Sequence, residues 1–312
     1  VREQDATIHM GRIVPIYEKL ASLTPKLHRR VVHQALKVVG DAFEDFLPPG
    51  IQERLGYPSR SRAIAESHFP QMTVALEELN EFRTLAQQRL VFDEFFFFQA
   101  GLALRRRELV SVKKNHSVTV NDRIRAAALE VLPFRLTGDQ RLVLKEIVSD
   151  LTKPEPMRRL LQGDVGSGKT IVAILAALVA MENNLQVALM SPTELLAEQH
   201  FTSLKQVLGR SRFGLSLLTG ATRTKERQRI AEQLADGSLQ LIVGTHALLQ
   251  GDVGFQRLGL VIIDEQHRFG VAQRSALGAK GSTPDILVMT ATPIPRTLAL
   301  TVYGDLDVSN IY

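Results

Sequence analysis

The sequence predicts an α/β fold with a parallel sheet in its C-terminal part, preceded by an all-helical N-terminal region. Two observations predict this arrangement. Up to about residue 112 the apolar residues recur mostly at helical spacing, whereas beyond residue 133 short apolar runs alternate with helical stretches. Strands without polar alternation, separated by helices, indicate a parallel sheet covered on both faces. We therefore expect a boundary near Pro133, with a helical region over 1–132 and an α/β domain over 133–312.

Length and composition allow about two domains with buried cores, since the chain has 312 residues and 45% hydrophobic content. The absence of cysteine excludes disulfides and thiolate metal sites and fits a cytoplasmic protein. No apolar run approaches the roughly 20 residues of a membrane-spanning helix, so we expect no contact with a membrane. The net charge of +5 suits a polyanionic partner such as DNA or RNA, although a solvated basic surface is the commoner cause of so small an excess.

The first helical stretch covers about residues 12–63, where apolar residues recur near helical spacing. Proline and glycine at 48–50, and again glycine, proline and serine at 56–59, predict breaks in it. A further stop is expected at 68–70, where a proline ends the next helical pattern.

The second stretch, residues 73–112, predicts one long helix or two. Three arginines at 105–107 either contact phosphate or form a solvated face. Four phenylalanines at 95–98 indicate core or interface packing, because adjacent aromatic residues point all round a helix. A short extended link is expected at 116–121.

The α/β part is expected to contain a series of buried strands. A short strand over 158–162 precedes a glycine-rich loop, and an apolar helix over 170–184 follows that loop. The other predicted strands, in chain order, are residues 187–190, 215–218, 239–243, 258–263 and 286–289.

The glycine-rich loop, residues 163–170 with the sequence GDVGSGKT, matches the pattern G-x-x-x-x-G-K-[ST] at every specified position. Its glycines allow backbone turns in which consecutive N–H groups converge on phosphate oxygens. Lys169 adds a charge for the β- and γ-phosphates, and Thr170 offers a hydroxyl to Mg²⁺. We therefore expect bound ATP or GTP, held by Gly163, Asp164, Val165, Gly166, Ser167, Gly168, Lys169 and Thr170.

A second acidic motif, LVIIDEQH over 260–267, places two carboxylates at the end of a buried strand. Asp264 is expected to hold Mg²⁺ through water, and Glu265 to polarise the attacking water near the γ-phosphate. Alone, such a pair could equally cap the following helix. Because it follows the phosphate loop by about 100 residues, we interpret Lys169, Asp264 and Glu265 as catalytic.

Together with these motifs, FRLTGDQ (134–140), SPTELLAEQH (191–200), LTGATR (218–223), VGTHALL (243–249) and TATPIPRTL (290–298) carry a resemblance. The sequence resembles the DExH-type superfamily 2 helicases, and among them the RecG branch-migration helicases. The resemblance implies a RecA-like P-loop lobe that binds ATP and Mg²⁺. It further implies adenine contacts by Phe134 and Gln140, DNA-backbone contacts by Pro192, Thr193, Gly220, Thr245 and His246, and coupling of hydrolysis to movement by His267, Thr290 and Thr292.

The transcription-repair coupling factor shares the stretches around residues 264–271 and 290–298, so these do not separate the two families. Ser167 and Gln266 favour the RecG pattern, as does the preceding helical region. An ordinary turn or cap role is open for any single hydroxyl in these loops.

The resemblance implies an ATP-dependent DNA translocase acting on branched DNA, such as stalled forks and Holliday junctions, in recombination and repair. We expect the chain to be a fragment, in which a helical linker follows a missing wedge domain and precedes the first motor lobe. The second RecA-like lobe would supply the arginine fingers, so the isolated fragment is expected to hydrolyse ATP near background. The alternatives are a motor lobe of a transcription-repair coupling factor, or a module that binds ATP and DNA without turnover.

Overall fold

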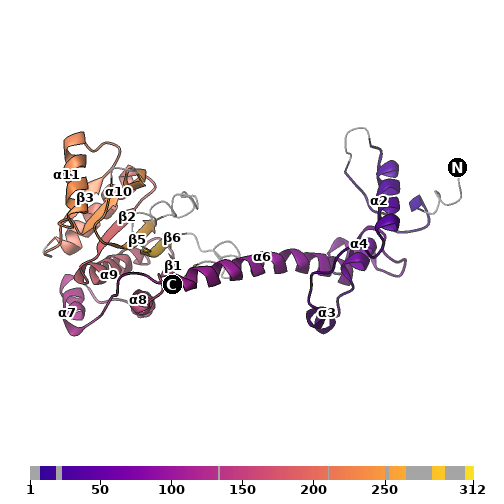
Figure 1. Cartoon of the computed structure of the whole chain (residues 1–312), viewed down its shortest axis with the longest axis horizontal. Coiled ribbons are helices and arrows are strands. Elements are labelled where there is room, and N and C mark those ends of the chain that lie inside the picture. The colour runs from indigo at the N-terminus through magenta and orange to yellow at the C-terminus, as the bar shows by residue number, and fades with distance from the viewer. Residues whose placement is uncertain are drawn as a thin grey trace. The chain divides into compact units, whose positions relative to one another are not determined.

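The computed structural model describes residues 8–18, 23–132, 134–209, 211–249, 253–264, 283–291 and 306–312 (Figure 1). Contacts within the chain divide it into two units, Val1–Gly101 and Leu102–Tyr312. None of the described helices combines the length and the apolar character that crossing a bilayer would require.

The first unit is helical in its described part, as predicted. Its helices are α2 (Pro25–Val39), α3 (Pro49–Leu55), α4 (Arg60–His68), α5 (Leu76–Asn80) and the start of α6 (Leu85–Ser111). Two boundaries differ from the prediction. Residues 12–18 are not helical, because α2 begins only at Pro25, where Thr24 accepts a hydrogen bond from Leu27 N. The expected break before residue 50 is confirmed, since residues 41–48 are not helical, but the next helix, α3, already begins at Pro49. A first-turn proline is tolerated because it lacks only an N–H that would have no partner there.

Residues 73–112 form two helices rather than one. Phe82 has a left-handed backbone (φ 55°) and separates α5 from α6. Of the phenylalanines in α6, some pack against other rings and some are exposed. Phe96 stacks on Phe92 with ring centroids 5.9 Å apart, whereas Phe95 is 57% exposed.

Arg89 of α6 is buried and joins several segments of the first unit. It donates hydrogen bonds to Asp93 at 2.9 Å, to the Pro58 carbonyl at 2.9 Å and to Asp45 at 2.5 Å. Burial would raise the pKa of the Asp45 carboxyl, but the hydrogen bonds from Arg89, Arg60 N and Leu47 N outweigh it and hold this pKa below its ordinary value. The ionised carboxylate of Asp45 therefore stabilises the folded unit.

The second unit contains a parallel sheet whose described strands follow the order β3-β4-β2-β5-β6-β1-β7. The strands are β1 (Arg158–Gly163), β2 (Gln186–Met190), β3 (Leu215–Leu218), β4 (Leu241–Gly244), β5 (Leu258–Asp264), β6 (Asp285–Thr290) and β7 (Asp307–Ile311). The accompanying helices are α7 (Asp122–Val131), α8 (Gly138–Thr152), α9 (Lys169–Glu182), α10 (Glu194–Leu208), α11 (Thr224–Ala235) and the short 3-10 helix η1 (His246–Leu249). The predicted strands are confirmed within one or two residues, and β7 was not predicted.

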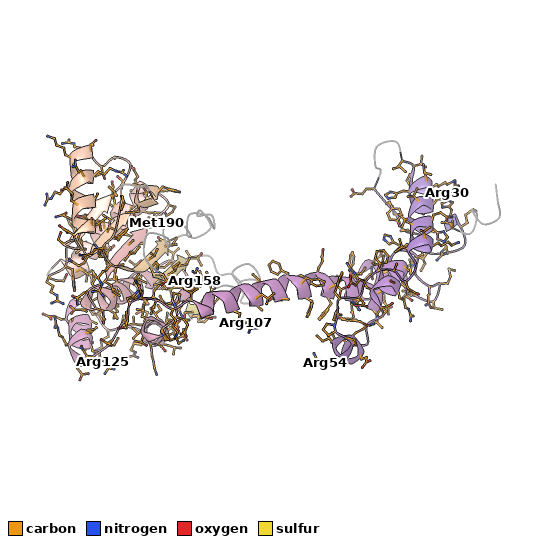
Figure 2. All side chains as sticks on the ribbon, viewed as in Figure 1. Arg30, Arg54, Arg107, Arg125, Arg158 and Met190 are labelled. Atoms are coloured by element: carbon orange, nitrogen blue, oxygen red, sulfur yellow. The ribbon has the colours of Figure 1, made fainter. Side chains whose placement is uncertain are left out.

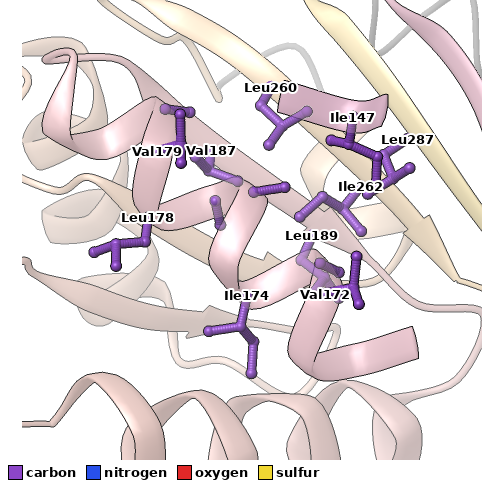
Figure 3. Packing of buried hydrophobic residues seen from close by; sticks show 14 of the residues in the cluster. Ile147, Val172, Ile174, Leu178, Val179, Val187, Leu189, Leu260, Ile262 and Leu287 are labelled. Carbon is purple, nitrogen blue, oxygen red and sulfur yellow. The ribbon is translucent and has the colours of Figure 1, made fainter. Parts of the chain in front are cut away.

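Two hydrophobic clusters cover the two faces of this sheet. Alternate residues of β2 show the division, since Val187 and Leu189 join one cluster and Ala188 and Met190 join the other. The first cluster contains α9, whose residues 171–181 are all buried, and it packs against strand residues such as Leu260 and Ile262 (Figure 3). Burial on both faces explains why the strands lack polar alternation.

The segment after Gly101 packs with the α/β unit. Residues 116–121 form neither helix nor strand, as expected, and Val118 and Ile124 enter the core beside α9. Lys114 is buried there and lies 3.1 Å from both carboxylate oxygens of Asp285, at the start of β6. Its Nζ also donates to the Leu151 carbonyl at 2.7 Å. The domain boundary at residue 133 stays a prediction.

Replacing Lys114 with Met should destabilise the second unit by up to about 3–5 kcal/mol, because it removes the ammonium partner of the buried Asp285 carboxylate. The contacts of this carboxylate with His116 Nε2 at 3.1 Å and Met157 N at 2.6 Å remain in the variant. The exposed neighbour Lys113 offers a matched control, and Lys113→Met should be nearly neutral. Urea unfolding of both variants measures the difference. Equal stability of the two would show that the buried ion pair contributes nothing.

The thermal stability of the first unit should depend on pH, because Asp45 loses its charge in acid. A carboxylate with a depressed folded pKa adds stability above its unfolded pKa, about 4, and loses it as the pH falls through the folded pKa. Wild type should therefore unfold at a higher temperature than Asp45→Asn at neutral pH, and the difference should shrink below about pH 4. A difference that is independent of pH would contradict this assignment.

Candidate nucleotide-binding site

The predicted phosphate loop lies between the carboxyl end of β1 and the first turn of α9. Gly166 and Gly168 have φ of 85° and 90°, which is the left-handed region that the sequence pattern required. Lys169 Nζ donates to the carbonyls of Gly163 at 2.7 Å and Asp164 at 2.8 Å. The loop thus curls around its own lysine, and the start of α9 directs its N–H groups to the same place.

Gln140, which was predicted to contact adenine, lies directly against this loop. It is 7% exposed, and its Nε2 donates to the Ser167 carbonyl at 2.9 Å. Its Oε1 accepts from Thr137 N at 3.0 Å, which completes a capping box at the start of α8. Phe134, the other predicted adenine contact, is 54% exposed. The adenine roles of both residues stay predictions.

The C-terminal strand β7 borders the loop as well. Ile311 pairs with Gly163, and a Cβ on Gly163 would lie 2.7 Å from the Ile311 carbonyl oxygen. Glycine at this position therefore permits a close backbone approach, whereas its own φ lies outside the left-handed region. The sequence offered no signal for this contact, because β7 itself was not predicted.

Asp264 is the last residue of β5, two strands from β1 at the same edge of the sheet. Its Oδ2 lies 2.6 Å from Nε2 of His200 on α10, and the two side chains are 13% and 11% exposed. Thr290 ends β6, the strand between them, and pairs with Gln162. The remaining predicted residues, Glu265, His267 and Thr292, lie outside the described residues.

The residues at this edge of the sheet fit a magnesium ion that is coordinated partly by the protein and partly by a bound nucleotide. The available groups, the Thr170 hydroxyl and the Asp264 carboxylate, supply the oxygen ligands that Mg²⁺ prefers. Among the described residues there is no cluster of three or more side chains that could hold a metal by themselves. Phosphate oxygens and water would therefore have to complete the coordination shell.

The predicted DNA-contact residues gather at the carboxyl ends of β2, β4 and β3, which are neighbours in the sheet. Thr193 caps α10 by accepting a hydrogen bond from Leu196 N at 3.3 Å. Glu194 Oε1 accepts from Ala221 N at 3.3 Å, which ties the loop after β2 to the loop after β3. Thr245 is 8% exposed. The structure also places the other predicted contacts, Pro192, Gly220 and His246, in these loops, without testing whether any of them binds DNA.

These features define a class of protein. A phosphate loop between a buried parallel strand and an apolar helix, with an acidic strand end at the same edge of the sheet, is the arrangement of P-loop nucleotide-binding domains. Residues 137–301, just over half of the chain, match the family model described as DEAD/DEAH box helicase. The chain belongs to the DEAD/DEAH box helicase family.

The chain is also similar to individual proteins along nearly its whole length. The ATP-dependent DNA helicase RecG of Synechocystis sp. is 48% identical over 302 residues, which cover 97% of this chain and 35% of the relative. RecG of Aquifex aeolicus is 42% identical over 313 residues, covering 97% of this chain and 39% of the relative. A solved structure of RecG bound to a three-way DNA junction is 38% identical, with a TM-score of 0.76, and the match covers 96% of this chain and 39% of that one.

The predicted resemblance to RecG and the predicted RecA-like lobe after a helical region are thereby confirmed. The chain spans less than half the length of the RecG proteins it matches.

Gly168→Ala should weaken both the fold and nucleotide binding. The left-handed backbone at residue 168 is unfavourable for alanine, and the added Cβ would lie 2.3 Å from Gln140 Nε2, so we expect a loss of about 1–3 kcal/mol. Gly138→Ala is the matched control, because nothing lies within 4 Å of a Cβ there. Thermal unfolding and calorimetric nucleotide titration measure both effects. Equal unfolding temperatures for the two variants would contradict this geometry.

Proposed function

We propose that this chain is the ATP-binding part of a motor that moves along DNA and acts on branched DNA, in recombination and repair. The observation that carries the proposal is that one edge of the sheet holds the phosphate loop and Asp264 next to the loops predicted to contact DNA. The relatives called ATP-dependent DNA helicase RecG, and the structure of RecG on a three-way DNA junction, support the same assignment. Such an enzyme would work in the cytoplasm, where the bacterial chromosome lies.

The proposed division of labour at the nucleotide follows the geometry of the loop. Lys169 would exchange its carbonyl partners for the β- and γ-phosphates, to which the N–H groups of the loop and of α9 also point. Thr170 and Asp264 would hold Mg²⁺, which when bound neutralises negative charge on the phosphates. Glu265 would accept a proton from the attacking water, and Phe134 and Gln140 would contact adenine.

The proposed role at DNA is backbone contact without base reading. Short hydroxyls and exposed N–H groups at strand ends can bind phosphate irrespective of sequence, as a motor that steps along DNA requires. Coupling by His267, Thr290 and Thr292, and partnership with a wedge domain and a second RecA-like lobe, belong to the same proposal. The position of Thr290 between the phosphate loop and Asp264 supports its part in coupling.

Lys169→Ala should abolish tight binding of ATP, because the phosphates lose the side-chain charge that the loop supplies. Isothermal titration with ATP and Mg²⁺ measures this loss, and the exposed Lys145→Ala on α8 controls for the removal of one charge. An unchanged dissociation constant in Lys169→Ala would remove the phosphate-loop assignment, and with it the proposed motor.

Glu265→Gln should lower ATP turnover while leaving ATP affinity intact, because glutamine keeps the shape of the side chain but cannot take up a proton from water. Hydrolysis should be measured on a three-way DNA junction, in a form of the protein that extends over the full length of its relatives. Turnover by the variant at the wild-type rate would exclude Glu265 as the proton acceptor. A wild-type enzyme that hydrolyses ATP without any response to DNA would contradict the proposed motor.

A further inference from the structure

His200 of α10 contacts the carboxylate that is proposed to hold Mg²⁺. Its Nε2 lies 2.6 Å from Asp264 Oδ2, and both side chains are largely buried. We propose that His200 is a positioning residue for Asp264, which fixes the orientation of this carboxylate and leaves its other oxygen for the metal ion. This inference rests on the proposed function, in which Asp264 is a magnesium ligand.

His200 is a polar residue on the side of α10 that packs against the sheet. Ala197 and Leu204, one turn to either side, are buried apolar residues that hold α10 against the sheet. His200 therefore lies on the packed face of the helix and places a polar ring at the end of β5. An ionised carboxylate can only accept, so Nε2 of the imidazole must donate its hydrogen in this pair.

Such a donor restricts a carboxylate that would otherwise rotate about its terminal bond. In other proteins, hydrogen-bond donors that contact a metal ligand rather than the metal orient that ligand. Their loss typically costs about 10–100-fold in metal affinity or activity. The same helix begins at Thr193, a predicted DNA contact, about two turns before His200. A displacement of α10 by DNA would therefore also move the partner of Asp264.

The test uses two substitutions of His200. His200→Leu removes the donor at similar volume, and His200→Gln restores an N–H at comparable reach. The readout is the Mg²⁺ concentration that half-saturates the binding of a fluorescent ATP analogue, measured without hydrolysis. We expect His200→Leu to raise this concentration about tenfold and His200→Gln to restore it to within a few-fold, with affinity for the metal-free analogue unchanged. Ser203→Ala is the control on the same helix, because its hydroxyl donates to the Gln199 carbonyl at 3.0 Å, within the helix itself.

Asp264→Asn separates the two hypotheses. If it raises the magnesium requirement and His200→Leu does not, the positioning role of His200 is wrong and the proposed metal ligand stands. If Asp264→Asn has no effect either, the proposed role of Asp264 itself fails. Should His200→Leu unfold, His200→Asn replaces it, because the shorter amide cannot reach Asp264 from α10.

A separate observation concerns the distribution of charge. Residues 8–40 contain six lysines and arginines and a single acidic residue, Glu18, so they account for the whole net charge of +5. The rest of the chain is electrically balanced. Helix α2 holds four of these cations and no acidic side chain, and Figure 2 shows Arg30 on it. We infer that α2 is a contact surface for the phosphate backbone of duplex DNA, which extends the proposed function beyond the motor lobe.

Helix α2 combines contacts to its own unit with a line of exposed cations. The side turned to its own unit is occupied, since Arg29 Nε donates to the Pro15 carbonyl at 2.8 Å and His28 stacks on Tyr17 at 4.4 Å. Lys26, Arg30 and Lys37 are exposed and lie on one line along the helix, because they are spaced by four and seven residues. On the same line, between Arg30 and Lys37, His33 packs edge-on against Phe69 with ring centroids 5.1 Å apart. They span about 16 Å of helix, enough to address several phosphates of one duplex.

Fluorescence anisotropy on a labelled DNA duplex tests this surface. Replacing Lys26, Arg30 and Lys37 together with glutamine should weaken binding and reduce the slope of log affinity against log salt by about two to three, one for each lost phosphate contact. The matched control replaces Arg54, Arg125 and Lys145, which are exposed cations on three other helices, two of them labelled in Figure 2.

An equal loss in both triple variants would show that only total charge matters and would overturn the inference. Unchanged binding in the α2 variant would likewise overturn the inference. If the unaltered chain binds no DNA at all, the proposed function fails together with this extension.

Discussion

Burial of α9 is the constraint on which the nucleotide site depends. This helix is apolar on every side, and it contacts α7, α8 and the strands β1, β2 and β5. Because no face of the helix can turn to water, its axis is fixed in the core and its first turn must lie at the end of β1. The phosphate loop is then a short connection between two buried elements, and its shape is set by glycines that tolerate left-handed backbone.

The order of the strands divides one edge of the sheet into two working regions. The β1, β6 and β5 ends hold the phosphate loop, Thr290 and Asp264, while the β2, β4 and β3 ends hold the loops predicted to contact DNA. β5 pairs with β2, so the two regions share a boundary between Asp264 and the start of α10. The hydrogen bond between His200 and Asp264 crosses this boundary.

Most of the fold could be predicted because its cause is local. An unbroken apolar run such as residues 258–263 predicts a buried strand by itself, and the helix after the loop follows from composition alone. β7 escaped prediction because its alternating polar residues, including Asp307 and Asn310, resemble a loop. It becomes a strand because β1 offers hydrogen-bonding groups to it, and because Arg159 donates to Ser309 at 2.6 Å. The helix expected from residue 12 was wrong for a different reason. The apolar spacing is already helical from residue 12 onward, but the cap residue and the proline that start a helix come later, so α2 begins only at residue 25.

The sequence by itself determined the chemistry of the phosphate loop and the family of the chain, because eight consecutive residues carry both the turn geometry and the charge that phosphate binding needs. Only the tertiary structure decided which distant groups support that chemistry. His200 and Asp264 are 64 residues apart, and Lys114 and Asp285 are 171 apart, yet both pairs are in hydrogen-bonding contact. No local pattern predicts such pairs, since a buried polar group takes whichever partner the packing of the sheet and helices places within reach.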